Sequence, residues 1–352
     1  MTRARLLLIA IPLVWILFHF LSGGSVLTAG NMVNLFKYLS VVGILATGMT
    51  LVIGAGQIDL SVGSLLGFLG AVNALLLAAG WPLPVALAAG ALLGLAAGAL
   101  HGILVSVFRV PSFIATLSGL LAYMGLKQYL ANPVIPLQNK FLIQLGQGSL
   151  HGAAAWIAAA TTVLILLVAA GRKRIVWAAV LGAGLLAMTA VAEQDRGIPL
   201  SVLALGLAGA LCHFIAVKTR AGRYAFALGS NAEAARYAGI PVRGVTIFAF
   251  ALMGLMAWLA GLTATSQLMA GAADIGDQQE LYAIAACVLG GTSLRGGSGS
   301  VWLSVLGAVL MASILNGMEQ MGIPSTMQKV ILGIILTVAV AIDPGTARKE
   351  RA

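Results

Sequence analysis

Residues 48–72 have the sequence "GMTLVIGAGQIDLSVGSLLGFLGAV", which contains the end of one long apolar run and the start of the next. A short polar segment, "QIDLS", separates the two runs. The apolar residues on both sides are continuous instead of alternating, which indicates membrane-spanning helices and not the strands of a barrel. A carboxylate at a helix amino terminus meets free N–H groups, so we expect Asp59, helped by Ser61 and Ser64, to cap a helix beginning at Leu60. A part in a gate is the alternative role for Asp59.

The same apolar pattern extends over nearly the whole chain. Of the 352 residues, 60% are hydrophobic and 9% are charged, and the mean hydropathy is +1.03. A hydrocarbon core about 30 Å thick is crossed by about 17–25 apolar residues in a helix, and runs of that length recur. The 44 glycines indicate close helix contacts. We therefore predict an all-α polytopic transmembrane bundle forming one domain over residues 1–352. The expected spans, about twelve of them, lie near 6–22, 33–54, 62–80, 84–107, 112–131, 153–170, 175–192, 199–217, 245–268, 281–294, 300–318 and 327–343.

The distribution of charge predicts the orientation of these spans. With both termini in the cytoplasm, most of the 20 basic residues fall on the inner side, as the positive-inside rule requires. These inner residues are Arg3, Arg5, Arg109, Arg172, Lys173, Arg174, Lys218, Arg220, Arg223, Arg236, Arg243, Arg295, Arg348, Lys349 and Arg351. Six acids fall outside, namely Glu193, Asp195, Asp274, Asp277, Glu280 and Glu319. The net charge of +10 is thus explained by topology and contact with anionic lipid, and we expect no nucleic-acid partner.

On this topology, residues 218–244 form the largest cytoplasmic loop, and the segment "GSNAEAARYAGIP" within it is typical of a short helix. Ser230 is expected to cap the first turn, and Glu233, three residues later, to reach back to the cap. Alanines favour the helix, Gly239 suits its left-handed end and Pro241 prevents continuation. A helix of about two turns is marginal alone in water and needs a packing partner. The segment is therefore either a docking helix for a cytoplasmic partner or a connector on the membrane surface.

The glycine-rich stretch "LGGTSLRGGSGS" at 289–300 is not expected to bind a nucleotide, because it lacks the Lys-Ser/Thr of a phosphate loop and follows no strand. We predict a tight cytoplasmic reverse turn with Arg295 near lipid phosphates or a partner. No catalytic or metal-binding pattern can be assembled from the scattered histidines, and Cys212 and Cys287 are expected to be core residues, so the chain is not predicted to be an enzyme.

Transport remains the expected function class, and its energy source is open between two alternatives. An ion-coupled secondary transporter usually carries ionisable groups near the bilayer midplane. Here Lys37, Lys127 and Lys329 are expected near span ends, where they can reach the interface, and the span centres are nearly free of charge. This pattern favours an external energy source; a purely structural membrane scaffold would explain neither the glycine-rich segments nor the capped loop. Polar residues within spans are candidates to line the solute path, namely Thr47, Thr50, Asn73, Thr116, Gln128, Gln267 and Asn316.

Three segments in one order carry a resemblance to a known family. "ALGSNAEAARYAGIPVRG" at 227–244 resembles the coupling-helix segment in permeases of the simple-sugar (ribose- and xylose-type) ATP-binding-cassette importers, and 48–72 and 280–300 resemble two further signatures of that family. Gln57 and Leu303 replace glycines of the usual pattern. The family has about ten spans, and the extra apolar hairpin at 150–197, with "GRKR" at its tip, resembles the xylose-type branch.

This resemblance implies a homodimeric permease, with cytoplasmic ATPase subunits that bind ATP and a sugar-binding protein outside the cytoplasmic membrane. No cofactor is then expected in this chain, and a pentose is the favoured cargo. The resemblance assigns ATPase coupling to Ser230, Asn231, Glu233, Ala234, Ala235, Arg236, Gly239 and Ile240. It assigns gate or structural motifs to Asp59, Leu60, Ser61, Gly63, Gly290, Gly291, Arg295, Gly296 and Gly297.

Overall fold

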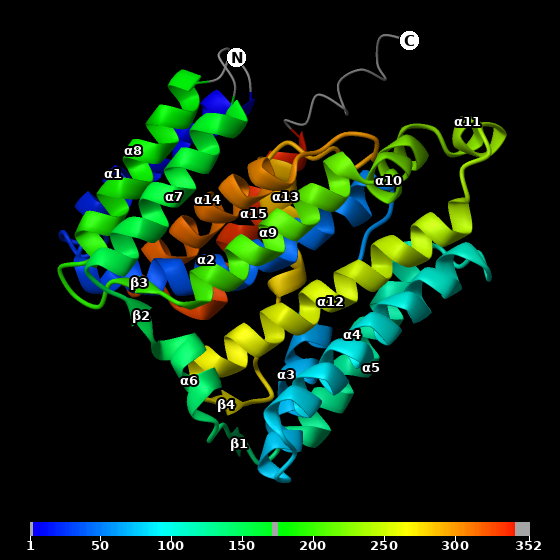
Figure 1. Ribbon diagram of the computed structural model, residues 1–352, viewed down its shortest axis with the longest axis horizontal. Coiled ribbons are helices and arrows are strands. Elements are labelled where there is room, and N and C mark those ends of the chain that lie inside the picture. Colours follow the sequence, from blue (N-terminus) through cyan, green and yellow to red (C-terminus); the bar gives the residue numbers. More distant parts are fainter. Residues whose placement is uncertain (1–2, 171–174, 342–352) are drawn as a thin grey trace.

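The computed structural model describes residues 3–170 and 175–341, and most of these residues are helical (Figure 1). The first helices are α1 (Arg3–Leu21), α2 (Ala29–Gly54), α3 (Val62–Ala78), α4 (Leu83–Ser106), α5 (Ser112–Leu130), α6 (Lys140–Gln147), α7 (Ala153–Ala170) and α8 (Ile175–Ala192). They are followed by α9 (Ser201–Lys218), α10 (Arg220–Ser230), α11 (Ala232–Tyr237), α12 (Val242–Leu268), α13 (Gln279–Leu289), α14 (Val301–Gln320) and α15 (Ser325–Ala341). The "GRKR" tip of the hairpin and the carboxyl-terminal basic residues lie outside the described residues.

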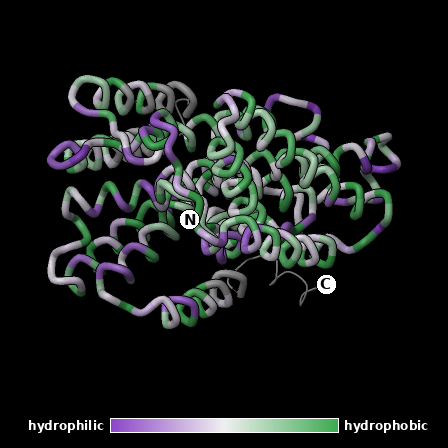
Figure 2. The backbone as a smooth tube through the Cα atoms, turned by 90° about the horizontal axis from the view of Figure 1, so that it is seen from below, coloured by the Kyte–Doolittle hydropathy of each residue, from purple (hydrophilic) through white to green (hydrophobic). Residues whose placement is uncertain are grey.

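Two short antiparallel ladders lie at one end of the bundle. β1 (Ile135–Pro136) pairs with β4 (Ala270–Gly271), and β2 (Ser149–Leu150) pairs with β3 (Ile198–Pro199). Together with α6 these ladders mark what we call the α6 end (Figure 1). The opposite end, the α11 end, carries α10, α11 and the turn between α13 and α14 (Figure 1). Hydrophobic residues run through the helices, and hydrophilic stretches gather in the connecting segments (Figure 2).

Helix α2 is the centre of the bundle. Most of its side chains are buried, and Leu35, Ile44 and Val52 each have an exposed fraction of 0%. Helices α9, α12, α13 and α14 all contact α2. A helix that is apolar around its whole circumference is stable only when surrounded, so α2 takes this place and the others expose one apolar face each. Exposed apolar side chains lie on several outer helices, among them α1, α4, α5 and α9, as expected of a surface covered by lipid.

Glycines let α4 and α12 pack backbone to backbone. A Cβ added to Gly254 would lie 1.9 Å from the carbonyl oxygen of Gly94, and one added to Gly98 would lie 2.1 Å from that of Phe250. Any larger residue at these places would separate the two helices. The close glycine contacts predicted from composition are therefore confirmed.

Each predicted span corresponds to a helix, but several bounds and lengths differ from the prediction. Helices α2, α4, α9, α12 and α14 are long and apolar enough to cross a membrane, by length and composition, among the residues searched. Helix α13 has 11 residues, which rise only about 16 Å. It ends at Leu289 and not at the predicted residue 294, because Gly291 has a positive φ of 90° that terminates the helix.

Candidate functional site

The segment predicted as a cytoplasmic loop contains two helices, α10 and α11, joined at Asn231. The side-chain oxygen of Asn231 accepts hydrogen bonds from the N–H groups of Glu233 at 3.0 Å and Ala234 at 2.9 Å. Asn231 has extended dihedrals, φ −160° and ψ 104°, as an N-cap residue requires. Asn231 is therefore the cap of α11.

The prediction that Ser230 caps this helix is wrong. Ser230 is the last residue of α10, and its hydroxyl donates to the carbonyl oxygen of Phe226 at 2.9 Å. Within the described residues, the Glu233 side chain makes no return bond to a cap. The reason is that α10, a helix that was not predicted, includes Ser230 as its last residue. Gly239 has a φ of 75° and ends α11 as predicted.

Helix α11 is attached to the bundle by one face. Ala235 is 4% exposed and packs in a small cluster with Ala55, Ala225, Leu228 and Val245. The other face is open to solvent, with Tyr237 at 84% exposed. Glu233, Ala234 and Arg236 are also exposed, while Ile240 is half-buried. The exposed face of this short helix, which we call the α11 surface, is formed by Asn231, Glu233, Ala234, Arg236 and Tyr237. The predicted coupling residue Ala235 lies in its buried base.

A glycine junction connects this base to α2 and to the turn between α13 and α14. The N–H of Gly297 donates to the carbonyl oxygen of Gly54, the last residue of α2, at 2.9 Å. A Cβ on Gly296 would lie 2.8 Å from the Cα atoms of both Gly229 and Gly56. Gly291, like the Gly296–Gly297 pair, has positive φ. The predicted tight turn is confirmed.

Gly290 lies on a second close contact, between α13 and α14, where a Cβ would meet the carbonyl oxygen of Leu303 at 2.4 Å. Gly307 makes the reciprocal approach to the carbonyl oxygen of Ala286. These two glycines provide close packing even though Leu303 replaces the glycine usual in the family pattern. Arg295 projects from the neighbouring turn and is exposed.

Asp59 is buried inside the bundle at 1% exposed. Its Oδ1 accepts from the N–H of Ser61 at 2.9 Å and from the Ser61 hydroxyl at 2.6 Å. Helix α3 begins at Val62, so the predicted start at Leu60 is wrong, and Asp59 does not cap its first turn. The segment runs extended along α5, because Leu60 donates its N–H to the hydroxyl of Thr116 at 3.0 Å.

His101 on α4 completes this buried group. Its Nδ1 lies 3.4 Å from the Ser61 hydroxyl, and its ring packs edge-on against Tyr123 of α5. His101 is one of the scattered histidines, and no pattern in the sequence indicates its proximity to Asp59. Gly63, the second residue of α3, allows the backbone of Gly276 to approach, since a Cβ at Gly63 would lie 2.6 Å from the carbonyl oxygen of Gly276.

Lys127 is fully buried, at 0% exposed, which contradicts the expectation that it reaches the membrane interface. Its ammonium donates to the carbonyl oxygen of Ile275 at 3.0 Å and forms an ion pair with Asp277. Glu280, predicted in an exposed outer loop, is also buried, at 8% exposed. The cause is the connection between α12 and α13, residues 272–278, which enters the bundle beside α3 and α5 instead of passing over its surface.

Five of the predicted path residues, Thr47, Thr50, Asn73, Thr116 and Asn316, are buried and hydrogen-bonded within or between helices. Asn316 exchanges hydrogen bonds with Asn31 at 2.7 and 2.8 Å. Gln267 donates to the carbonyl oxygen of Lys37 at 3.2 Å. In this conformation Thr50 and Asn316 bond to side chains of other helices, and Thr47 and Asn73 donate to carbonyl oxygens of their own helix. The role of the predicted path residues along a solute path stays a prediction.

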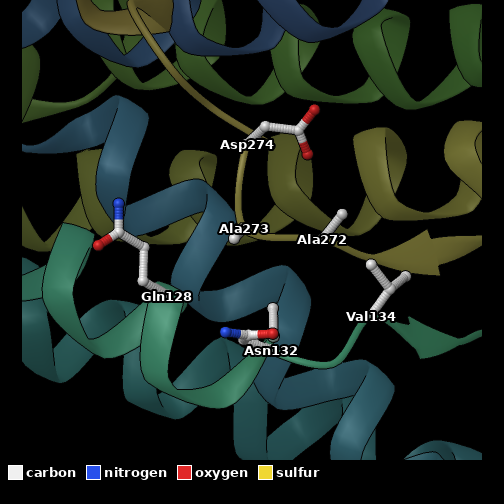
Figure 3. Close-up of a pocket in the computed structure, with 7 residues that line it drawn as sticks. Gln128, Asn132, Val134, Ala272, Ala273 and Asp274 are labelled. Atoms are coloured by element: carbon white, nitrogen blue, oxygen red, sulfur yellow. The ribbon is translucent and has the colours of Figure 1, made fainter.

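Gln128 is the predicted path residue that lines a pocket. This pocket, of about 520 Å³, lies at the α6 end between α5 and the connection that follows β4 (Figure 3). Its walls are Gln128, Ala131, Asn132, Val134, Ala272, Ala273 and Asp274. Figure 3 shows Gln128 and Asn132 on the α5 side of the pocket and Asp274 on the opposite side, in the connection that follows β4.

Comparison with known proteins gives matches over nearly the full length. A family model described as "Branched-chain amino acid transport system / permease component" matches residues 31–340. The chain is 39% identical over 360 residues to the xylose transport system permease protein of Escherichia coli strain K12, with 97% of this chain and 91% of the relative aligned. The protein of the same description from Haemophilus influenzae is 38% identical, with 99% and 97% aligned. The ribose import permease protein of Escherichia coli strain K12 is 34% identical, with 90% and 86% aligned. No solved structure matches the chain.

Proposed function

Because the chain belongs to the family described as the permease component of the branched-chain amino acid transport system, and its relatives include xylose and ribose permeases, we propose that it is the membrane subunit of an ATP-driven sugar importer. A pentose, with xylose first, is the favoured cargo. The observation that carries this proposal is full-length similarity to xylose permeases, which includes the hairpin formed by α7 and α8.

The α11 surface is the proposed contact for a cytoplasmic ATPase. Its helix is short and exposed, yet its base packs on Ala55 and Val245, so force applied there would pass directly to α2 and α12. The hydrogen bond between Gly54 and Gly297 adds the α13–α14 turn to the same unit. Binding of ATP by two such ATPases would move the α11 surfaces of a permease homodimer together and rock the helices as rigid bodies.

The remaining partners follow from the same proposal. An extracytoplasmic sugar-binding protein would deliver the sugar at the α6 end, and the chain would lie in the cytoplasmic membrane with the α11 end inside. The basic residues of the α11 end, among them Arg109, Arg220 and Arg243, support this orientation. Their charge also suits contact with anionic lipid.

An ion-coupled secondary transporter is the second candidate, and the buried ionisable groups favour it. Asp59, His101 and Lys127 are 1%, 2% and 0% exposed, so the expectation that the span interiors are nearly free of charge is wrong for this part of the bundle. Ionisable residues inside membrane proteins commonly mark ion or proton routes. If the chain is instead an ATP-driven importer, Asp59, His101 and Lys127 have a structural role and hold α3, α4, α5 and the connection 272–278 together.

Reconstitution separates the two candidates. The chain is placed in vesicles with candidate ATPase and binding proteins, and uptake of D-xylose and D-ribose is measured with ATP, without ATP, and after collapse of the proton gradient. Uptake that requires ATP and the ATPase and survives loss of the gradient supports the importer. Uptake by the purified chain alone, driven by a pH gradient, would establish the secondary transporter instead.

A further inference from the structure

The pocket at the α6 end combines polar and apolar walls. Gln128, Asn132 and Asp274 are exposed, and none of the three side chains makes a hydrogen bond or ion pair within residues 3–170 and 175–341. Alanines and Val134 form the remaining walls. The volume of about 520 Å³ falls in the range of about 300–1,000 Å³ that is usual for sites binding small molecules.

The chemistry of these walls matches hydroxyl groups. A carboxylate accepts hydrogen bonds, and the amides of Gln128 and Asn132 both donate and accept, so together they can satisfy hydroxyls in either role. The apolar residues between them suit the C–H faces of a small ring. Asp274 gives the pocket negative charge, whereas the charge of Asp277 is paired with Lys127, and the charge of Asp274 disfavours an anionic solute. The pocket therefore fits a neutral polyhydroxylated solute.

Lys127 fixes the two walls of the pocket relative to each other. It precedes Gln128 on α5, and its acceptor Ile275 follows Asp274 on the connection. The ammonium bonds to the Ile275 carbonyl oxygen and pairs with Asp277. On the far side, Gly67 of α3 leaves space for the connection, since a Cβ there would lie 2.2 Å from the same carbonyl oxygen. The position of Asp274 opposite Gln128 thus depends on one buried ammonium.

We propose that this pocket is a transit site where Gln128, Asn132 and Asp274 bind the hydroxyl groups of the sugar, and that Lys127 is the positioning residue that sets its width. The proposal rests on the proposed import function and names a binding site for its cargo. Each lost hydrogen bond should slow passage by a modest factor, because a transit site must bind weakly enough to release.

The first test uses Asn132→Leu and Asp274→Leu in vesicles that contain the complete importer. D-Xylose uptake per complex should fall about three- to tenfold, the factor expected from one lost hydrogen bond. Asp195→Leu is the matched control, since Asp195 is an exposed acid of the same end outside the pocket. Docking of the loaded binding protein is measured by co-purification and should not change. D-Xylose uptake equal to that of Asp195→Leu overturns the site. A decrease in uptake that is explained by weaker docking of the binding protein also overturns it.

The second test addresses Lys127. Lys127→Met should change the ratio of D-xylose to D-ribose uptake about threefold or more, because the pocket changes width, whereas general damage lowers both rates equally. Lys127→Arg should restore the ratio. If Lys127→Met does not fold, Asp277→Ala replaces it, because this side chain is 61% exposed and removes one contact of the ammonium. An unchanged ratio in a folded variant overturns the positioning role. If the unmodified importer takes up neither sugar, the import function itself fails, separately from the site.

Discussion

Removing the cap of α11 is the most direct test of how this helix is held. In Asn231→Ala the side-chain oxygen that accepts from Glu233 and Ala234, at 3.0 and 2.9 Å, is lost. Asn231 is exposed, so the released N–H groups bond to water and do not remain unsatisfied in a buried site. The cost should therefore be that of an ordinary N-cap, about 1 kcal/mol. This free energy corresponds to about a fivefold increase in local opening of the helix.

Hydrogen exchange of the permease in detergent measures this opening. Ala238, Gly239 and Ile240 donate their N–H groups to carbonyls of α11, so their exchange reports whether the helix is formed. Protection should fall about fivefold in Asn231→Ala. Ser230→Ala is the matched control, because it deletes a hydroxyl that bonds to the carbonyl oxygens of Phe226 in α10 and Gly297 in the α13–α14 turn, neither of which belongs to α11. Protection of α11 should not change.

The two variants also test the proposed docking role. If the ATPase binds only the formed helix, co-purified ATPase should fall by at most the same fivefold factor in Asn231→Ala and stay normal in Ser230→Ala. A loss of protection in Ser230→Ala with none in Asn231→Ala would refute the assignment of the cap. Normal docking in a variant that has lost the helix would reduce α11 to a connector.

Three further predictions concern packing, a buried amide pair and topology. Gly98→Ala should lower the melting temperature in detergent, because its Cβ would meet a carbonyl oxygen at 2.1 Å and overpacking costs about 1–3 kcal/mol. Gly125→Ala is the control and should not lower it, because a Cβ there meets nothing within 4 Å. Equal shifts in the two variants would contradict the close contact. Asn316→Leu should destabilise the protein by about 1–3 kcal/mol without changing the xylose-to-ribose uptake ratio, since its amide bonds to a buried partner; a changed ratio would instead place it on the solute path. A cysteine at Asp195 should react with an impermeant reagent outside intact cells and one at Glu233 should not, and the reverse pattern would invert the topology.

Features that depend on neighbouring residues in the sequence were predictable. The start of α7 at Ala153 and the end of α8 at Ala192 agree with the predicted spans 153–170 and 175–192, because continuous apolar runs define helices wherever the lipid or the bundle surrounds them. The end of α11 at Gly239 was equally local, since a φ of 75° is accessible to glycine and strained for most other residues. The cap was missed by one residue only, because a helix immediately before it takes Ser230.

The sequence by itself therefore determined the long apolar helices, their glycine-dependent turns and the family, each of which depends on short-range pattern or on similarity along the chain. The tertiary structure alone decided the place of the charged groups. Along the sequence, Lys127 is 148 residues from Ile275 and 150 residues from Asp277. His101 is 40 residues from Ser61. An isolated lysine in an apolar run is expected at the interface, because burying an unpaired charge is costly. Burial becomes stable only when distant segments supply acceptors, and those acceptors exist here because the connection 272–278 folds into the glycine-lined groove of α3.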